Sequence, residues 1–198
     1  MRIIAGKFRG RRLQPSGALD LRPTSDRLRE TLFDVIAAAG GLEGTRWLDL
    51  YAGTGAVGIE ALSRGASCAC FVESARAPAA LIKRNLDSLD IAGCATILQK
   101  PALKALDELD AKIRGGSERA FDFSFLDPPY RLEVEYERVF ARLAKSSVLS
   151  TNALLVAEHS KHFELAALAG TWSRVRRLQQ GDAVLSFYRQ LTTPSLQQ

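Results

Sequence analysis

The sequence predicts an α/β protein built on a mainly parallel sheet of seven strands. One strand is expected to be antiparallel, with helices on both faces and an N-terminal β-hairpin extension. From residue 46 onward, short apolar runs alternate with longer stretches of helical period, the pattern of βαβ units. Phe121–Leu126 is nearly continuously apolar, as expected of a strand buried on both faces. Two strand-like runs meet at Gly181-Asp182, a hairpin signal that supplies the antiparallel strand.

The length of 198 residues fits one domain with a small appendage. We place a basic arm at 1–23, the main domain at 24–191 and a tail at 192–198. No apolar stretch approaches the roughly 20 residues that span a bilayer, and the first residues lack the apolar core of a signal peptide. No membrane partner is therefore expected, and the predicted location is cytoplasmic.

Glycines and a capping residue define the N-terminal elements. Ile3–Ala5 and Lys7–Leu13, which are separated by one glycine, predict a short and irregular hairpin. Thr24 or Ser25 can cap the helix that begins at Asp26, because their side-chain oxygens accept hydrogen bonds from the first turn. Apolar residues then recur at helical spacing until Gly40-Gly41 ends the helix.

The rest of the chain alternates between strands and helices. The predicted strands are Arg46–Tyr51, Ser67–Glu73, Ala95–Gln99, Phe121–Leu126, Ala153–Glu158, Trp172–Leu178 and Ala183–Gln190. The predicted helices are 56–64, Arg76–Leu89, Ala102–Ile113 and Glu133–Ala144. In an open sheet of this kind, ligands bind beyond the carboxyl ends of the strands. Residues that follow several strands are therefore expected to meet at one edge.

The formal charge of +5 is concentrated at the N-terminus. The first thirty residues hold eight basic and three acidic side chains, whereas the remainder holds nineteen of each. A basic arm on a neutral body suggests a polyanionic partner, and interleaved glycines and Phe8 favour a nucleic acid over a solvated tail. The residues predicted to bind RNA are Arg2, Lys7, Arg9, Arg11 and Arg12.

The cysteines and histidines do not predict a metal site. Cys68, Cys70 and Cys94 form an odd set without a CxxC pair, which argues against a disulfide framework or bound zinc. All three are expected to be small core residues. His159 and His162 are the only histidines, and His159 is interpreted as a hydrogen-bonded polar residue at a strand end.

A glycine loop, 53–58, follows the first predicted strand of the sheet. It matches the dinucleotide-binding fingerprint, and Glu73 stands twenty positions after Gly53, where a ribose-binding acidic residue is expected. Asp49 precedes the loop and would repel a pyrophosphate, whereas it suits S-adenosylmethionine, which carries a sulfonium and an ammonium group. The alternative is structural, with Asp49 as a cap and the glycines as a tight turn.

Asp127-Pro128-Pro129-Tyr130 follows the fourth strand. The Asp127 carboxylate and the Pro128 carbonyl can accept the two N–H hydrogens of an exocyclic amine, which frees its lone pair for alkylation. Tyr130 would stack on the base, and the prolines would stiffen the loop. The alternative is a proline turn that closes the strand.

Several segments together resemble one family. The chain is similar to the class I, Rossmann-like S-adenosylmethionine-dependent methyltransferases and, among them, to the bacterial 16S rRNA (guanine-N2)-methyltransferases. The glycine loop and the Asp-Pro-Pro-Tyr motif alone specify only methylation of an amine by this cofactor. The N-terminal segment narrows the resemblance to the guanine-N2 enzymes. The matching segments are Arg2–Arg11, Arg22–Phe33, Leu48–Gly55, Glu60–Ala66, Glu158-His159-Ser160 and 181–188.

The resemblance implies a function and a set of site residues. The substrate would be 16S rRNA within an assembling small subunit. A methyl group would pass from S-adenosylmethionine to the N2 amine of a guanine, and S-adenosylhomocysteine would be the product. Asp127, Pro128, Pro129 and Tyr130 would form the catalytic site, without a metal. The cofactor would be held by Asp49, Tyr51, Ala52, Gly53, Thr54, Gly55 and Glu73.

Two features of the sequence leave alternatives open. Gln99-Lys100-Pro101-Ala102 lacks the acidic residue that the family commonly carries near the adenine. Arg27 and Glu30 can either form a surface ion pair or, by resemblance, border the methionine end of the cofactor. Competing functions are methylation of adenine N6, cytosine N4 or a protein glutamine, and RNA binding without catalysis.

Overall fold

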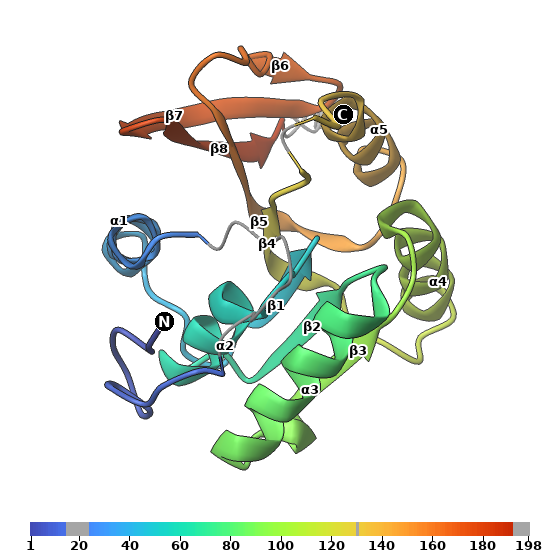
Figure 1. Ribbon diagram of the computed structural model, residues 1–198. Coiled ribbons are helices and arrows are strands. Elements are labelled where there is room, and N and C mark those ends of the chain that lie inside the picture. The colour runs from blue at the N-terminus through green and yellow to red at the C-terminus, as the bar shows by residue number, and fades with distance from the viewer. Residues whose placement is uncertain (15–23, 130, 192–198) are drawn as a thin grey trace.

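The computed structural model describes residues 1–14, 24–129 and 131–191. Its centre is an eight-stranded sheet in the order β3-β2-β1-β4-β5-β8-β7-β6 (Figure 1). The strands are β1 (Arg46–Leu50), β2 (Cys68–Val72), β3 (Ala95–Leu98), β4 (Phe121–Leu126), β5 (Leu149–Ser160), β6 (Leu168–Ala169), β7 (Trp172–Gln180) and β8 (Ala183–Gln190). The helices are α1 (Asp26–Ala38), α2 (Ala56–Ser63), α3 (Arg76–Leu89), α4 (Ala102–Arg114) and α5 (Val134–Leu143), with one 3₁₀ turn at Ala92–Cys94.

The predicted fold class is confirmed, with one strand more than expected. β1 to β5 run parallel, and β8 pairs antiparallel with β5, as the hairpin signal at Gly181-Asp182 predicts. The additional strand, β6, pairs antiparallel with β7 through Leu168↔Ser173 and Ala169↔Trp172. Both β8 and β6 are therefore reversed. A two-residue strand has no sequence period, so no pattern in the chain predicts β6.

Helices cover both faces of the sheet because alternate residues of the central strands point to opposite sides. Trp47 packs in a core with α1, α2 and α3, whereas its neighbour Leu48 packs in a second core with α4 and α5. Both side chains are fully buried. This two-sided burial produces the nearly continuous apolar runs of the parallel strands.

Residues 1–14, named here the N-terminal strap, pack against the body of the protein. The predicted hairpin is reduced to one antiparallel bridge between Arg2 and Arg12, without regular strands. The backbone N–H groups of Ile4 and Ala5 donate to the Glu60 carboxylate on α2, at 2.8 and 2.9 Å. A side chain at Gly6 would overlap a backbone carbonyl of α2, so this glycine permits the close approach. The strap is therefore not a solvated tail.

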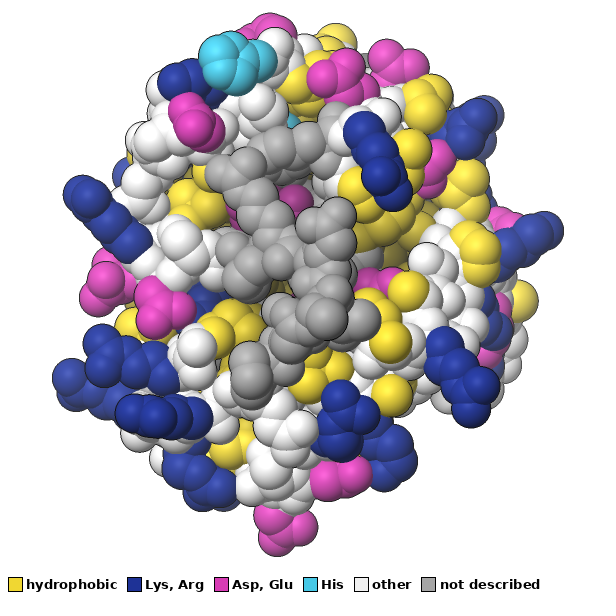
Figure 2. Space-filling model, in the orientation of Figure 1, with side chains coloured by type: hydrophobic (Ala, Val, Ile, Leu, Met, Phe, Trp, Pro, Cys, Tyr) yellow, Lys and Arg dark blue, Asp and Glu magenta, His cyan; other side chains and the backbone are white. Residues whose placement is uncertain are grey.

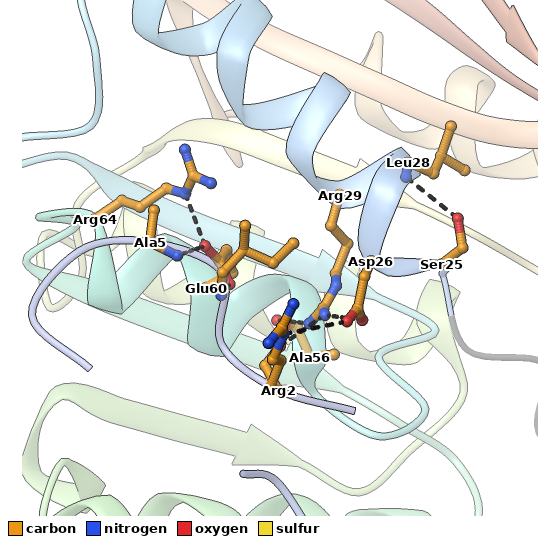
Figure 3. A network of polar contacts seen from close by, with 10 residues as sticks. Arg2, Ala5, Ser25, Asp26, Leu28, Arg29, Ala56, Glu60 and Arg64 are labelled. Atoms are coloured by element: carbon orange, nitrogen blue, oxygen red, sulfur yellow. Dashed lines mark hydrogen bonds and ion pairs between the residues drawn. The ribbon is translucent and has the colours of Figure 1, made fainter. Parts of the chain in front are cut away.

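Two buried charged residues join the strap to the helices (Figure 3). Glu60 is fully buried and also accepts a hydrogen bond from Arg64, at 2.8 Å. Arg29 on α1, likewise fully buried, donates to Asp26 at 2.7 Å and to the Arg2 carbonyl at 2.8 Å. Because a buried charge is costly without partners, these contacts fix the position of the strap relative to α1 and α2.

The remaining predictions for the body have mixed outcomes. Ser25 caps α1 by accepting from the Leu28 N–H at 3.2 Å. Of the three cysteines expected in the core, Cys70 is buried and Cys68 only partly buried. Cys94 is exposed, because it lies on the surface turn before β3. Among the described residues, no helix is long and apolar enough to cross a membrane, and no group of His, Cys, Asp and Glu side chains is arranged to hold a metal ion.

Candidate active site

A cleft of about 600 Å³ opens at the carboxyl ends of β1, β2, β4 and β5. This is the edge at which ligands bind in open parallel sheets. The cleft brings together two segments that are far apart in the sequence, the glycine loop and the segment after β4. The predicted site residues that line it are Asp49, Tyr51, Ala52, Gly53, Thr54, Glu73, Asp127, Pro128 and Pro129.

Glu73 holds the glycine loop in place from the end of β2. Its carboxylate accepts from the Gly53 N–H at 2.9 Å and from the Ala75 N–H at 2.8 Å. Gly55 is not among the residues that line the cleft. It is the residue before α2 and has a φ of 76°, and a side chain there would press on Ile82. Gly55 therefore shapes the turn rather than the cleft surface.

Asp49 is a buried carboxylate at the end of β1, with 2% of its surface exposed. It accepts from the Gly58 N–H in the first turn of α2, at 2.9 Å, which is the helix-capping contact that its structural alternative predicts. Burial raises the pKa of Asp49 to about 7, although the Gly58 hydrogen bond opposes the shift. A side chain at position 58 would overlap the Phe71 ring, so only glycine fits here.

Tyr51 links the glycine loop to α5. Its backbone has φ of 62°, which is rare for a residue other than glycine, and its hydroxyl donates to Glu135 at 2.6 Å. Burial and the neighbouring carboxylate both raise the pKa of this hydroxyl above its usual range. The side chain thus connects the glycine loop to the helix that follows the Asp127 segment.

The segment after β4 enters the cleft directly. The Asp127 N–H donates to the Leu50 carbonyl at 3.4 Å, which extends the pairing of β4 with β1 by one residue. Asp127 is half-buried, Pro128 buried and Pro129 exposed. The Pro129 carbonyl accepts from the Leu132 N–H at 2.7 Å, which turns the chain toward α5. Tyr130 lies outside the described residues.

Glu158 lines the cleft from the end of β5 with only 5% of its surface exposed, and the sequence assigned it no role. The Thr24 hydroxyl donates to its carboxylate at 2.9 Å, and the Tyr136 hydroxyl to its backbone carbonyl at 2.6 Å. The signal that could have found Glu158 is its place at the carboxyl end of the predicted strand Ala153–Glu158. His159 next to it bonds Ser186 at 2.9 Å, which confirms its interpretation as a satisfied polar residue.

The charge of the cleft suits a cationic ligand. Asp49, Glu73, Asp127 and Glu158 line it, and Arg131 is the one basic side chain among the described lining residues. Four carboxylates would repel a pyrophosphate and attract a sulfonium or ammonium group. The residues present therefore fit S-adenosylmethionine better than a dinucleotide.

The predicted RNA-binding residues lie away from the cleft. All five are exposed, and Figure 2 shows Lys and Arg side chains gathered at the lower left, where Figure 1 places the N-terminal strap. Arg11 donates to the Ser88 carbonyl at the end of α3, at 2.8 Å. A second recess of about 400 Å³ lies between the strap and α1. It is lined by Arg2, Ile3, Ile4, Arg9, Gly10, Asp26, Arg27 and Glu30.

The two features that the sequence leaves open both lie outside the lining of the cleft. Arg27 and Glu30 line the recess beside the strap and are not among the residues that line the cleft. Lys100, which stands where an acidic residue is common, forms an ion pair with Glu108 on α4 and also does not line the cleft.

Comparison with known proteins agrees with this arrangement. Residues 1–189 match the family model described as conserved hypothetical protein 95. The chain is 33% identical to ribosomal RNA small subunit methyltransferase D of Escherichia coli (strain K12), over 96% of this chain and 89% of that protein. It is 32% identical to "Putative rRNA methyltransferase YlbH" of Bacillus subtilis (strain 168), over 96% and 98% of the two chains.

A solved structure extends the similarity to the fold. "Putative methyltransferase yhhF" from Escherichia coli superposes with a TM-score of 0.81 at 33% identity, covering 98% of this chain and 99% of that one. The match spans the sheet, the cleft and the N-terminal strap. The chain therefore belongs to the family described as conserved hypothetical protein 95, the RNA methyltransferase family of ribosomal RNA small subunit methyltransferase D.

Proposed function

We propose that this protein transfers a methyl group from S-adenosylmethionine to the exocyclic N2 amine of a guanine in 16S rRNA. The observation that carries the proposal is the single acidic cleft shared by the glycine loop and Asp127-Pro128-Pro129. A methyl donor and an amine acceptor must meet in one place for an in-line transfer, and this cleft supplies both sets of contacts.

The cofactor supplies an electrophilic methyl group on a positively charged sulfur. The chain's own residues bind and orient the reactants. Glu73 can accept further hydrogen bonds from ribose hydroxyls, since a carboxylate has about four acceptor sites and the Gly53 and Ala75 N–H groups each use one. Asp49 balances positive charge from beneath the loop. Asp127 and the Pro128 carbonyl accept the amine hydrogens, and the negative Asp127 stabilises the positive charge that develops on the amine.

The N-terminal strap is proposed as the RNA contact. Its five exposed cations stand on a segment held rigidly by Glu60 and Arg29, so little ordering cost accompanies phosphate binding. The body is otherwise neutral, which favours a substrate with further protein contacts, such as an assembling small subunit in the cytoplasm.

The test incubates the protein with methyl-labelled S-adenosylmethionine and small-subunit particles that lack the modification, followed by nucleoside analysis by mass spectrometry. Label in N2-methylguanosine is the expected result. Label in N6-methyladenosine or N4-methylcytidine would overturn the guanine assignment. Binding of S-adenosylhomocysteine without any transfer would instead favour an RNA-binding protein that does not catalyse.

Replacing Arg9, Arg11 and Arg12 together with alanine is expected to weaken RNA binding and flatten its salt dependence. Loss of three phosphate contacts lowers the slope of log affinity against log salt by about 2 for single-stranded RNA. Fluorescence anisotropy with labelled 16S rRNA between about 50 and 200 mM salt measures this slope.

The matched control removes Lys104, Arg119 and Lys145, which are exposed cations on or beside the helices of the opposite face. That variant has the same change in net charge, so it separates local contacts from overall attraction. Equal slopes for the two triple variants would contradict a specific role for the strap.

A further inference from the structure

We infer that Glu158 reads the base, by accepting the N1–H of the target guanine, and so selects guanine over adenine. The inference rests on the proposed function and extends it, because Asp127 and Pro128 contact only the exocyclic amine. An amine alone does not distinguish guanine N2 from adenine N6. A second acceptor at the neighbouring ring position would do so.

Glu158 stands where such an acceptor is needed. Leu126 on β4 and Ala157 on β5 are partners in the parallel register, so Asp127 and Glu158 are the next residues on adjacent strands. Adjacent strands lie about 4.8 Å apart, which places the two residues side by side at the edge of the sheet. Both line the same cleft.

The sheet order also separates the two ligands. Asp49 and Glu73 lie at the carboxyl ends of β1 and β2, on one side of β4, whereas Glu158 lies near the carboxyl end of β5, on the other side. Asp127 lies between them. The base that receives the methyl group must therefore bind toward β4 and β5. In that position Glu158 contacts the base rather than the methyl donor.

The hydrogen-bonding edge of guanine matches two adjacent carboxylates. Guanine presents N1–H beside the N2 amine, so its edge offers consecutive donors, and a carboxylate only accepts. Adenine has an acceptor at N1, which an ionised Glu158 would repel. A flipped base is read along this same edge by the protein that extrudes it.

Thr24 positions the Glu158 carboxylate for this role. Its hydroxyl donates to one carboxylate oxygen at 2.9 Å, and both side chains line the cleft. Glu158 is 5% exposed and Thr24 7% exposed, so bulk water does not compete for this hydrogen bond. A purely structural role for Glu158 would be to tie the segment before α1 to β5.

The test compares Glu158→Gln with the wild-type protein on two substrates. Small-subunit particles are reconstituted with either guanine or 2-aminopurine at the nucleotide that the wild-type protein methylates. 2-Aminopurine keeps the N2 amine but has an acceptor at N1. Wild type is expected to prefer guanine by at least about 100-fold in kcat/KM, because 2-aminopurine presents an acceptor to the buried Glu158 carboxylate where guanine presents the N1–H donor.

In Glu158→Gln, kcat/KM on guanine is expected to fall about 10- to 100-fold. The ratio of kcat/KM on guanine to that on 2-aminopurine is expected to fall by about 10-fold or more. The glutamine oxygen still accepts from Thr24, and its amide N–H donates to the N1 acceptor of 2-aminopurine. Binding of S-adenosylhomocysteine, measured by calorimetry, is expected to stay within about twofold. Glu137→Gln, on the exposed side of α5, is the matched control and should keep the wild-type ratio.

The outcomes separate the two proposals. If wild type methylates guanine and Glu158→Gln loses activity on both bases equally, Glu158 is structural and the inference is overturned while the proposed function stands. If wild type places no label on guanine N2, the proposed function fails in the wild-type arm alone, and the inference fails with it. A ratio that narrows only in Glu158→Gln supports the inference.

Discussion

Replacing Asp127 with alanine is expected to lower methyl transfer by about 1,000-fold, while the affinity for S-adenosylhomocysteine stays within about threefold. In the proposed site the carboxylate accepts an amine hydrogen and faces the charge that develops there, and loss of one such preorganised group costs about 100- to 1,000-fold in rate. Asp127 comes after β4, whereas the residues proposed to hold the cofactor lie at the ends of β1 and β2. Single-turnover transfer of labelled methyl and calorimetry measure the two quantities separately.

A conservative variant sharpens this test. Asp127→Asn keeps one oxygen acceptor and the same size, so it isolates the charge from the hydrogen bond. Transfer by the asparagine variant is expected to fall between those of wild type and Asp127→Ala. Equal losses of transfer and cofactor affinity in Asp127→Ala would contradict the assignment, since the residue would then serve the cofactor rather than the amine.

Much of the fold follows from local sequence patterns. The prediction of β4 at Phe121–Leu126 and of α3 at Arg76–Leu89 is confirmed residue for residue. The first is a nearly continuous apolar run and the second has a helical period over its full length, so local pattern and tertiary packing agree. The shared edge of parallel strands likewise predicts that the glycine loop and Asp127 meet, because that result depends on topology and not on side-chain detail.

The residues that the sequence did not identify are charged groups with distant partners. Glu60 and Arg29 look like ordinary helix-surface residues, yet both are fully buried and bind the strap across 27 to 56 positions of sequence. A local sequence pattern does not indicate contacts with residues that are so far away in the sequence. Glu158 was visible only as part of a matching segment, and its place beside Asp127 requires the register of β4 and β5.

Cofactor binding is expected to weaken below pH 7, because Asp49 must be ionised to attract a cation. In the unliganded protein its pKa is raised to about 7, chiefly by burial, from an ordinary value of 3.8, and the nearby Glu73 contributes. The folded protein therefore holds this proton more tightly than the unfolded chain does. The stabilisation from that proton is complete below about pH 4 and is lost as the pH rises through about 7, unless a cationic ligand balances the charge.

The affinity for S-adenosylmethionine should accordingly fall roughly 25-fold between pH 7.5 and 5.5, with about one proton released on binding at the lower pH. Calorimetry in buffers of different ionisation enthalpy counts that proton. In Asp49→Asn the amide oxygen can still accept from the Gly58 N–H, so the fold is retained while this titration disappears. The variant should bind more weakly at pH 7.5 and show little pH dependence. An unchanged pH profile in Asp49→Asn would assign the proton to another group and remove Asp49 from the electrostatic recognition of the cofactor.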